Sequence, residues 1–311
     1  MLDALLAELM TEPVTPVWHR SVLVEEVVHY LAPSAGEIIA DCTAGTGGHS
    51  LAILPHVMPT GRVLAIDCDG QALVRAQQRL TEFEPHVQCV RGNFRHLPDL
   101  LKQGKVTKVD GLIADLGLSS LHVDQPERGF SFSHEDPLDM RMDRQATATA
   151  ASLIQQLPEP DLIFLLERYG EERWARRIAK RIVTVRKRQP IRTTTQLARV
   201  VAEAVPKGHA KRRLHPATRT FLALRIAVNE ELVALEALLK VLPTVLAPGG
   251  RAVIITFHSL EDRLVKQAFR QGAQQGYFQV LTKKPVRPSP RELAENPRSR
   301  SAKLRAVERL S

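Results

Sequence analysis

Short apolar runs alternate with amphipathic segments over the first part of the chain, and this pattern predicts an α/β fold. Short runs that are apolar throughout are typical of strands buried on both faces of a parallel sheet. The predicted strands cover residues 38–42, 62–66, 87–90 and 109–114, and the predicted helices cover residues 21–31, 51–57 and 71–82, with a short helix after residue 94. This spacing indicates a doubly wound sheet, in which right-handed crossovers place the loop after each strand along one edge.

The alternation stops after the fourth predicted strand and resumes near residue 220. The intervening segment opens with irregular polar residues and continues with helical patterns at 150–157, 160–188 and 194–205. Beyond it we expect a helix at 219–242, a turn at 248–250, a strand at 251–256, a helix from 260, and a closing hairpin of strands 277–281 and 304–310. We therefore predict an N-terminal extension (1–17), a discontinuous α/β domain (18–123 and 221–311) and an inserted helical substrate-recognition domain (124–220).

The composition is that of an ordinary globular protein, with 44% hydrophobic and 25% charged residues. No apolar run is long enough to span a bilayer, and the first ten residues lack the basic stretch of a signal peptide. The three cysteines, Cys42, Cys68 and Cys89, show no metal-binding spacing and read as core thiols. These features predict a cytoplasmic protein with no resident metal and no membrane partner.

Positive charge is concentrated in two stretches of the chain. Residues 168–225 contain 17 Lys and Arg against 3 acids, and residues 283–311 contain 9 against 3, although the whole chain carries a net charge of only +9. A basic segment joined to an acidic body favours a nucleic-acid partner over a merely solvated helix face. Within the basic turn 207–213, Arg212 and Arg213 are the candidate phosphate contacts.

A glycine-rich turn with the sequence DCTAGTGGHS, residues 41–50, joins the first predicted strand to a helix. Glycines there let the backbone approach a ligand. Asp67 ends the next strand, where such folds hold ribose hydroxyls, unless it merely caps the helix that begins near residue 71. A dinucleotide fingerprint would need a third glycine where Ser50 stands. Gly45, Gly47 and Gly48 instead suit a loop around the methionine end of S-adenosylmethionine, or a tight turn without a ligand.

Asp115 ends the fourth predicted strand, on the edge that would hold the cofactor. An amine that accepts a methyl group must shed a proton, and a nearby carboxylate can orient the amine and stabilise its developing charge. Asp115 is therefore the candidate catalytic residue, unless it merely caps the next turn. Phe94, after the third strand, would be either a neighbour of an adenine ring or a core residue.

Residues 116–118, after the fourth strand, contain no aromatic side chain, so one that stacks on a flipped base must come from elsewhere. The candidates are Phe130, Phe132 and Phe257. His258 follows the fifth strand and could orient a substrate; alternatively Ser259 and Asp262 form a capping box there. Methylation of a base carbon is disfavoured, because it needs an activated cysteine and none ends the fourth strand.

Taken together, these motifs resemble the bacterial small-subunit ribosomal RNA cytosine-N4 methyltransferases. The resemblance runs from about residue 19 to the C-terminus and is carried by residues 41–50 and by the motifs DLGLSS (115–120), RGFSF (128–132), PLDMRM (137–142), YGEE (169–172), HPATRTF (215–221), FHSLEDR (257–263) and NPR (296–298). It implies a Rossmann-like methyltransferase sheet with an inserted, mainly helical domain.

The resemblance also implies the cofactor, the substrate and several contacts. The cofactor would be S-adenosylmethionine, and the substrate a cytidine near the decoding site, in naked small-subunit ribosomal RNA or the assembled subunit. The implied cofactor contacts are Gly48, His49, Ser50, Asp67, Phe94 and Asp115, with His122 at a position where the family usually has glutamine. Two alternatives stay open: a non-catalytic RNA-binding assembly protein with a vestigial pocket, and a nicotinamide-dependent Rossmann enzyme. Whether the chain forms a homodimer is also left open.

Overall fold

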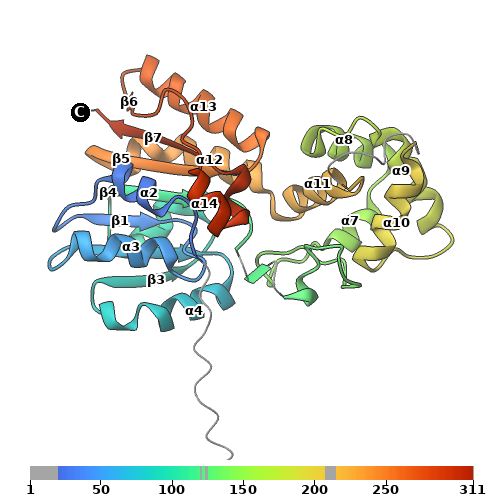
Figure 1. Ribbon diagram of the computed structural model, residues 1–311, viewed down its shortest axis with the longest axis horizontal. Coiled ribbons are helices and arrows are strands. Elements are labelled where there is room, and N and C mark those ends of the chain that lie inside the picture. Colours follow the sequence, from blue (N-terminus) through green and yellow to red (C-terminus); the bar gives the residue numbers. More distant parts are fainter. Residues whose placement is uncertain (1–19, 120, 123–124, 207–214, 311) are drawn as a thin grey trace, which may run out of the picture.

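The computed structural model describes residues 20–119, 121–122, 125–206 and 215–310, which form an α/β unit and a helical unit side by side (Figure 1). The α/β unit contains both ends of the described chain, and the helical unit is inserted between them. No described helix combines the length and the apolar character needed to span a bilayer.

The described strands form a seven-stranded sheet in the order β3-β2-β1-β4-β5-β7-β6, which confirms the predicted α/β fold. Their bounds are β1 Ile38–Asp41, β2 Arg62–Asp67, β3 Val87–Arg91, β4 Val109–Asp115, β5 Leu246–Thr256, β6 Phe278–Val280 and β7 Lys303–Arg309. The first five strands are parallel, and β7 runs antiparallel between β5 and β6, so the predicted closing hairpin is confirmed. Parallel pairing aligns the carboxyl ends of β1 to β5 along one edge of the sheet.

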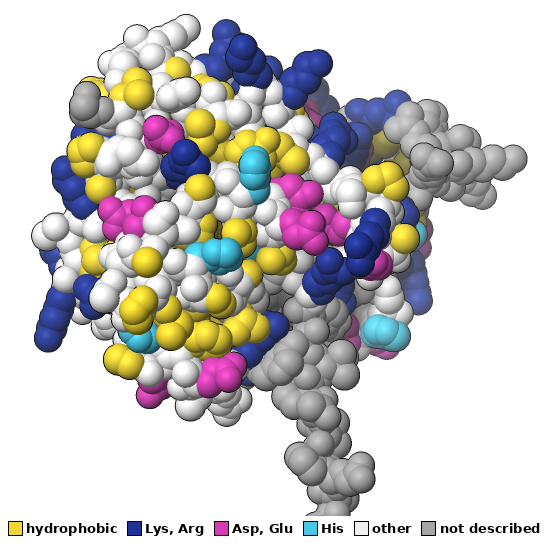
Figure 2. Space-filling model, turned by 60° about the vertical axis from the view of Figure 1, so that its left-hand side comes forward, with side chains coloured by type: hydrophobic (Ala, Val, Ile, Leu, Met, Phe, Trp, Pro, Cys, Tyr) yellow, Lys and Arg dark blue, Asp and Glu magenta, His cyan; other side chains and the backbone are white. Residues whose placement is uncertain are grey.

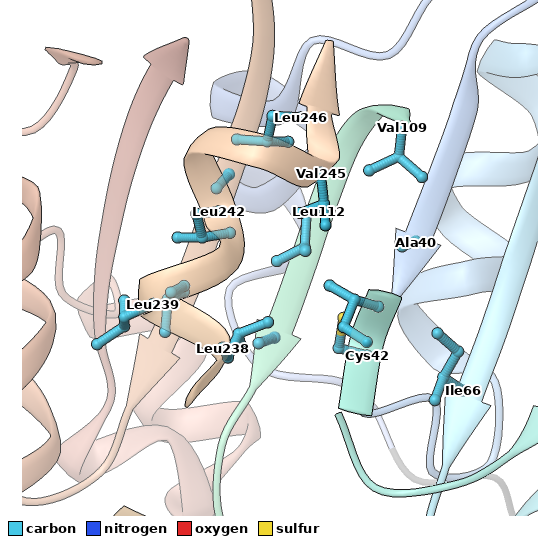
Figure 3. Close-up of a cluster of buried hydrophobic side chains, with 14 of the residues drawn as sticks. Ala40, Cys42, Ile66, Val109, Leu112, Leu238, Leu239, Leu242, Val245 and Leu246 are labelled. Atoms are coloured by element: carbon cyan, nitrogen blue, oxygen red, sulfur yellow. The ribbon is translucent and has the colours of Figure 1, made fainter. Parts of the chain in front are cut away.

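Helices cover both faces of the sheet and bury its apolar strands. On one face, α5 (Leu97–Gln103), α12 (Glu231–Val245) and α13 (Ser259–Gln274) share a core with the strands. Figure 3 shows α12 placing Leu238 and Leu242 near Leu112 of β4. The other face packs against α2 (Val24–Leu31) and α3 (Gly48–Val57), while α4 (Gly70–Arg79) lies against β2 and β3.

The helical unit has a separate hydrophobic core. Its helices are α7 Ala150–Gln156, α8 Glu159–Gly170, α9 Ala175–Arg186, α10 Thr194–Ala204 and α11 Thr218–Asn229. The core includes Phe221, Leu224 and Val228 of α11, which packs on α8. We therefore propose to end the inserted domain after α11 rather than at residue 220, because these side chains are buried with the insert and not with the sheet.

Three predicted elements differ from the structure, each because of a local backbone feature. The predicted helix 160–188 is two helices, since Glu171 adopts a left-handed conformation (φ 46°) that ends α8. The predicted helix 219–242 is likewise broken at Glu230 (φ 49°) between α11 and α12. The predicted turn at 248–250 lies within β5, where the register against β4 shifts between Val109 and Gly111.

Candidate active site

A cavity of about 400 Å³ lies along the edge where the parallel strands end. Its walls come from segments that directly follow β1, β2, β3, β4 and β5, and from α11 and α12. Among the sequence-predicted site residues, the wall contains Gly45, Gly48, His49, Asp67, Phe94, Asp115, His122 and Phe257. This is the position at which a doubly wound sheet binds its ligand.

The glycine turn forms the floor of the cavity. Gly45 (φ 54°) and Gly47 (φ 83°) both adopt left-handed conformations, and Gly47 caps the start of α3. A Cβ at Gly45 would only reach van der Waals contact, with Ser119 and Thr43 at 3.9 Å, so no atom crowds the turn here. A ligand can therefore lie directly against this backbone.

Ser50 supports this turn from beneath instead of lining the cavity. Its hydroxyl donates to Asp41 Oδ2 (2.7 Å), while the Thr43 backbone N–H donates to Asp41 Oδ1 (3.3 Å). Burial raises the pKa of the Asp41 carboxyl despite these hydrogen bonds. Gly47 is also absent from the cavity wall. The structure thus places two residues that were predicted to bind the cofactor, Gly47 and Ser50, in the support of the turn.

Asp67 presents a carboxylate held by backbone donors at the end of β2. Its Oδ2 accepts from the Gly45 N–H (2.7 Å), and its Oδ1 accepts from the Asp69 N–H (2.8 Å). Burial raises the pKa of Asp67, and the two backbone donors oppose that shift. Each oxygen keeps capacity for a further hydrogen bond. Phe94 begins the segment after β3 and offers a partly buried ring to the same cavity.

Asp115 and His49 form a polar pair inside the cavity. His49 Nε2 lies 3.4 Å from Asp115 Oδ2, and the Asp115 N–H donates to the Thr43 hydroxyl (2.6 Å). Asp115 Oδ1, both ring nitrogens of His49 and Ser119 Oγ are buried without a hydrogen-bond partner among the described residues. Burial alone would lower the pKa of His49, but the carboxylates of Asp115 and Asp41 outweigh it and raise that pKa. Because buried polar groups are normally paired, these atoms are available to hydrogen-bond a ligand in the cavity.

His122 lines the cavity but uses both ring nitrogens within the protein. Its Nδ1 accepts from the Ser119 N–H (3.2 Å), so Nε2 carries the proton and donates to Asp69 Oδ2 (3.0 Å). The same oxygen accepts from Arg128 Nη2 (2.7 Å). Burial would raise the pKa of Asp69, but His122 and Arg128 lower it. His122 therefore orients Asp69, whose N–H in turn holds Asp67.

Sequence reasoning missed Asp69 and Arg128. Arg128 is almost fully buried and also donates to the Met142 carbonyl (2.8 Å), so it ties the inserted segment to the cavity wall. Asp69 caps α4 through the Gln71 N–H (2.9 Å). In the sequence, Arg128 stands out only as the first residue of the RGFSF motif. Its partner Asp69 lies 59 residues away, and no local pattern predicts a contact over that separation.

Phe130 and Phe132, predicted to stack on a base, pack against the core of the helical unit and do not line the cavity. The Phe130 ring lies 5.2 Å from that of His122, and Phe132 lies edge-on to Phe221 at 4.8 Å. Both aromatic side chains therefore pack against other residues of the protein and not against the cavity. Phe257 alone among the three stacking candidates reaches the cavity wall.

His258 also lies off the wall, because it caps α13. Its Nδ1 accepts from the Glu261 N–H (3.4 Å), and the Glu261 carboxylate accepts from the His258 N–H (3.2 Å). The capping box is therefore formed by His258 and Glu261, one residue earlier than the predicted Ser259 and Asp262. Arg212 and Arg213 lie outside the described residues.

The sheet order, the glycine turn after β1 and the acids that end β2 and β4 define a Rossmann-like methyltransferase. Comparison with known families identifies the methyltransferase family. Residues 16–310 match the MraW methylase family, and the chain belongs to this family. Membership favours the predicted methyl-donor pocket over the nicotinamide-dependent alternative.

Curated relatives agree with this assignment along nearly their full length. Ribosomal RNA small subunit methyltransferase H of Geobacter sp. (strain M21) is 46% identical over 307 residues, covering 94% of this chain and 98% of the relative. The protein of the same name from Geotalea daltonii is 48% identical with the same coverage. That of Trichormus variabilis is 49% identical over 291 residues, covering 94% of this chain and 92% of the relative.

Proposed function

We propose that this protein transfers a methyl group from S-adenosylmethionine to the N4 amino group of a cytidine in small-subunit ribosomal RNA, near the decoding site. Relatives that are 46–49% identical carry the name ribosomal RNA small subunit methyltransferase H. The structural observation that carries the proposal is Asp115, which ends β4 beside the glycine turn and keeps one buried oxygen unpaired. The protein would then act in the cytoplasm, with its RNA.

The cavity fits the proposed cofactor. We assign its methionine end to the turn at Gly45 and Gly48 with His49, its ribose to Asp67, and its adenine to the partly buried Phe94. His49 Nδ1 and the Ser119 hydroxyl supply hydrogen-bonding groups that have no partner among the described residues. When bound, S-adenosylmethionine supplies an electrophilic methyl group whose leaving group is a neutral thioether.

Asp115 would act on the incoming amine. Its unpaired Oδ1 can accept an N4–H hydrogen bond, which aims the amine at the methyl group and stabilises the positive charge that develops on nitrogen. One N–C bond forms as one C–S bond breaks, and the amine sheds one proton. No covalent bond to the protein is needed, so alignment and exclusion of water are the main tasks of the site.

The basic charge of the helical unit supports an RNA substrate. Residues 168–225, with their excess of Lys and Arg, fall on α8 to α11 and the segments between them. On the face shown in Figure 2, by contrast, Lys and Arg are dispersed among acidic and apolar side chains. Arg20, 53% exposed, and the exposed Arg298 lie at the cavity rim. We assign RNA phosphates to the helical unit and this rim, with the target base entering the cavity between them.

Incubation with labelled S-adenosylmethionine tests the proposal. Naked small-subunit RNA and assembled small subunits are supplied separately, and the modified nucleoside is identified by mass. We expect label in N4-methylcytidine from at least one substrate. Cofactor binding in a calorimetric titration without any methyl transfer would instead support the non-catalytic assembly protein.

A further inference from the structure

The part of the cavity wall formed by α11 and α12 carries a charged pair that the proposed chemistry does not use. Arg225, on α11, donates from Nε and Nη2 to the two carboxylate oxygens of Glu231, on α12, both at 2.8 Å. The left-handed Glu230 between the two helices turns the chain so that they meet. The Arg225 and Glu231 side chains are only 13% and 9% exposed, and both line the cavity that contains Asp115.

Arg225 keeps hydrogen-bonding capacity on the cavity side. Glu231 occupies one edge of the guanidinium, and Nη1 makes no hydrogen bond to the described residues. The bidentate pairing also fixes the plane of the guanidinium, because two parallel hydrogen bonds allow little rotation. A fixed, largely buried donor of this kind is available to an acceptor on whatever occupies the cavity.

Two other polar side chains of the cavity wall, on α11 and α13, already form hydrogen bonds within the protein. Asn229 accepts from the Met142 N–H and donates to the Met140 carbonyl, both at 2.8 Å. Glu261 accepts from the backbone N–H groups of Phe257 (2.8 Å) and His258 (3.2 Å). Arg225 is therefore the group among these that can address a substrate.

The hydrogen-bonding edge of cytosine is complementary in donor and acceptor type to Asp115 and Arg225, which line the same cavity. Cytosine offers donors at its N4 amine and acceptors at N3 and O2. Asp115 Oδ1 can accept from the amine, and Arg225 can donate to the adjacent ring acceptors. Uracil reverses both contacts, since its O4 would face the carboxylate and its N3–H would face the guanidinium. The partly buried Phe257 supplies an apolar surface on the same wall.

We propose that Arg225, held in place by Glu231, reads the N3 and O2 edge of the target cytosine and selects it against uracil. The inference rests on the proposed function, because it takes a cytidine amine at Asp115 as its reference point. Arg225 would be a specificity-determining residue and Glu231 a positioning residue.

The test varies the base and the arginine together. Methylation is measured on RNA with the target cytidine and on RNA with 3-deazacytidine, which keeps the amine but lacks the N3 acceptor. The wild type should lose roughly 10- to 150-fold in kcat/KM on the deaza substrate, as expected for one charge-assisted hydrogen bond. In Arg225→Gln, cytidine RNA should lose a similar factor, and 3-deazacytidine should cost little more. Comparing the two enzymes cancels the intrinsic reactivity of the altered base.

Arg251→Gln is the matched control, because Arg251 pairs with Glu308 (2.9 Å) away from the cavity and should keep the full dependence on N3. Undiminished N3 dependence in Arg225→Gln would overturn the inference. If Arg225→Gln fails to fold, equal wild-type kcat/KM values on cytidine RNA and 3-deazacytidine RNA would be enough to overturn the inference. Active methylation of cytidine RNA without N3 dependence refutes only the role of Arg225, whereas no methylation of any cytidine RNA refutes the proposed function.

Discussion

Replacing Arg128 by methionine should destabilise the protein and weaken the cofactor pocket together. Arg128 and Asp69 are only 1% and 2% exposed and form a 2.7 Å ion pair between the inserted segment and the start of α4. Removing one partner of a buried ion pair leaves the other charge uncompensated, which costs about 3 to 5 kcal/mol. Asp69 would keep His122 Nε2–H and the Gln71 N–H as donors. We therefore expect the lower end, about 3 kcal/mol, in the free energy of unfolding.

A double-mutant cycle measured by urea denaturation separates this effect from lost packing. The four proteins are the wild type, Arg128→Met, Asp69→Asn and the double variant. Asp69→Asn removes the charge that Arg128→Met leaves unpaired. The double variant should therefore lose less unfolding free energy than the two single variants combined, by at least about 1 kcal/mol. Arg181→Met is the matched control, since the Arg181–Glu203 pair is exposed and should cost less than about 1 kcal/mol.

The same cycle reports on the cofactor pocket. The Asp69 N–H holds Asp67 Oδ1, so a displaced Asp69 should also weaken cofactor affinity in calorimetry. Additive stability losses, within about 0.5 kcal/mol, would refute the idea that Arg128 acts through the Asp69 charge.

Three further predictions follow from single residues. Asp67→Asn should weaken cofactor binding roughly 10- to 150-fold in calorimetry; because burial raises the pKa of Asp67, wild-type affinity should fall as the pH is lowered through that raised value, whereas a pH-independent wild type would contradict this. Charged His49 contributes to the free energy of unfolding below the ordinary histidine pKa, and this contribution is lost as the pH rises through its raised pKa. The loss of unfolding free energy in His49→Gln should therefore shrink as the pH rises above about 6.5. A loss that stays constant with pH would argue against the ion pair with Asp115. Arg298→Ala should reduce the salt slope of RNA binding by about 1 in filter-binding assays, and an unchanged slope would remove it from the phosphate contacts.

The strand ends were predictable from the sequence because they depend on local pattern and general topology. Asp67 and Asp115 each follow an apolar run, and parallel pairing with right-handed crossovers brings such positions to one edge whatever the side-chain detail. The cavity wall contains both residues. The glycine turn was predictable for the same reason, because its left-handed conformations are a local requirement that glycine meets.

Contacts between distant segments could not be predicted in this way. The Arg225–Glu231 pair depends on the helix break at Glu230, a non-glycine residue in a left-handed conformation that helical periodicity does not announce. Phe130 and Phe132 were predicted as base contacts because aromatic side chains suit stacking, but the same rings also fill cores. Ser50 was predicted as a cofactor contact, whereas its hydroxyl is used by the buried Asp41. Each of these differences comes from tertiary packing that competes for the same side chain.

The most direct test of the account compares methyl transfer by the wild type, Asp115→Asn and Asp115→Ala. Each is supplied with labelled S-adenosylmethionine and small ribosomal subunits, the product nucleoside is identified by mass, and the cofactor Kd is measured in parallel. We expect N4-methylcytidine from the wild type, a loss of at least about 100-fold in kcat for Asp115→Ala, and a Kd changed much less. Undiminished turnover by Asp115→Ala on the same RNA would contradict the central role of this carboxylate.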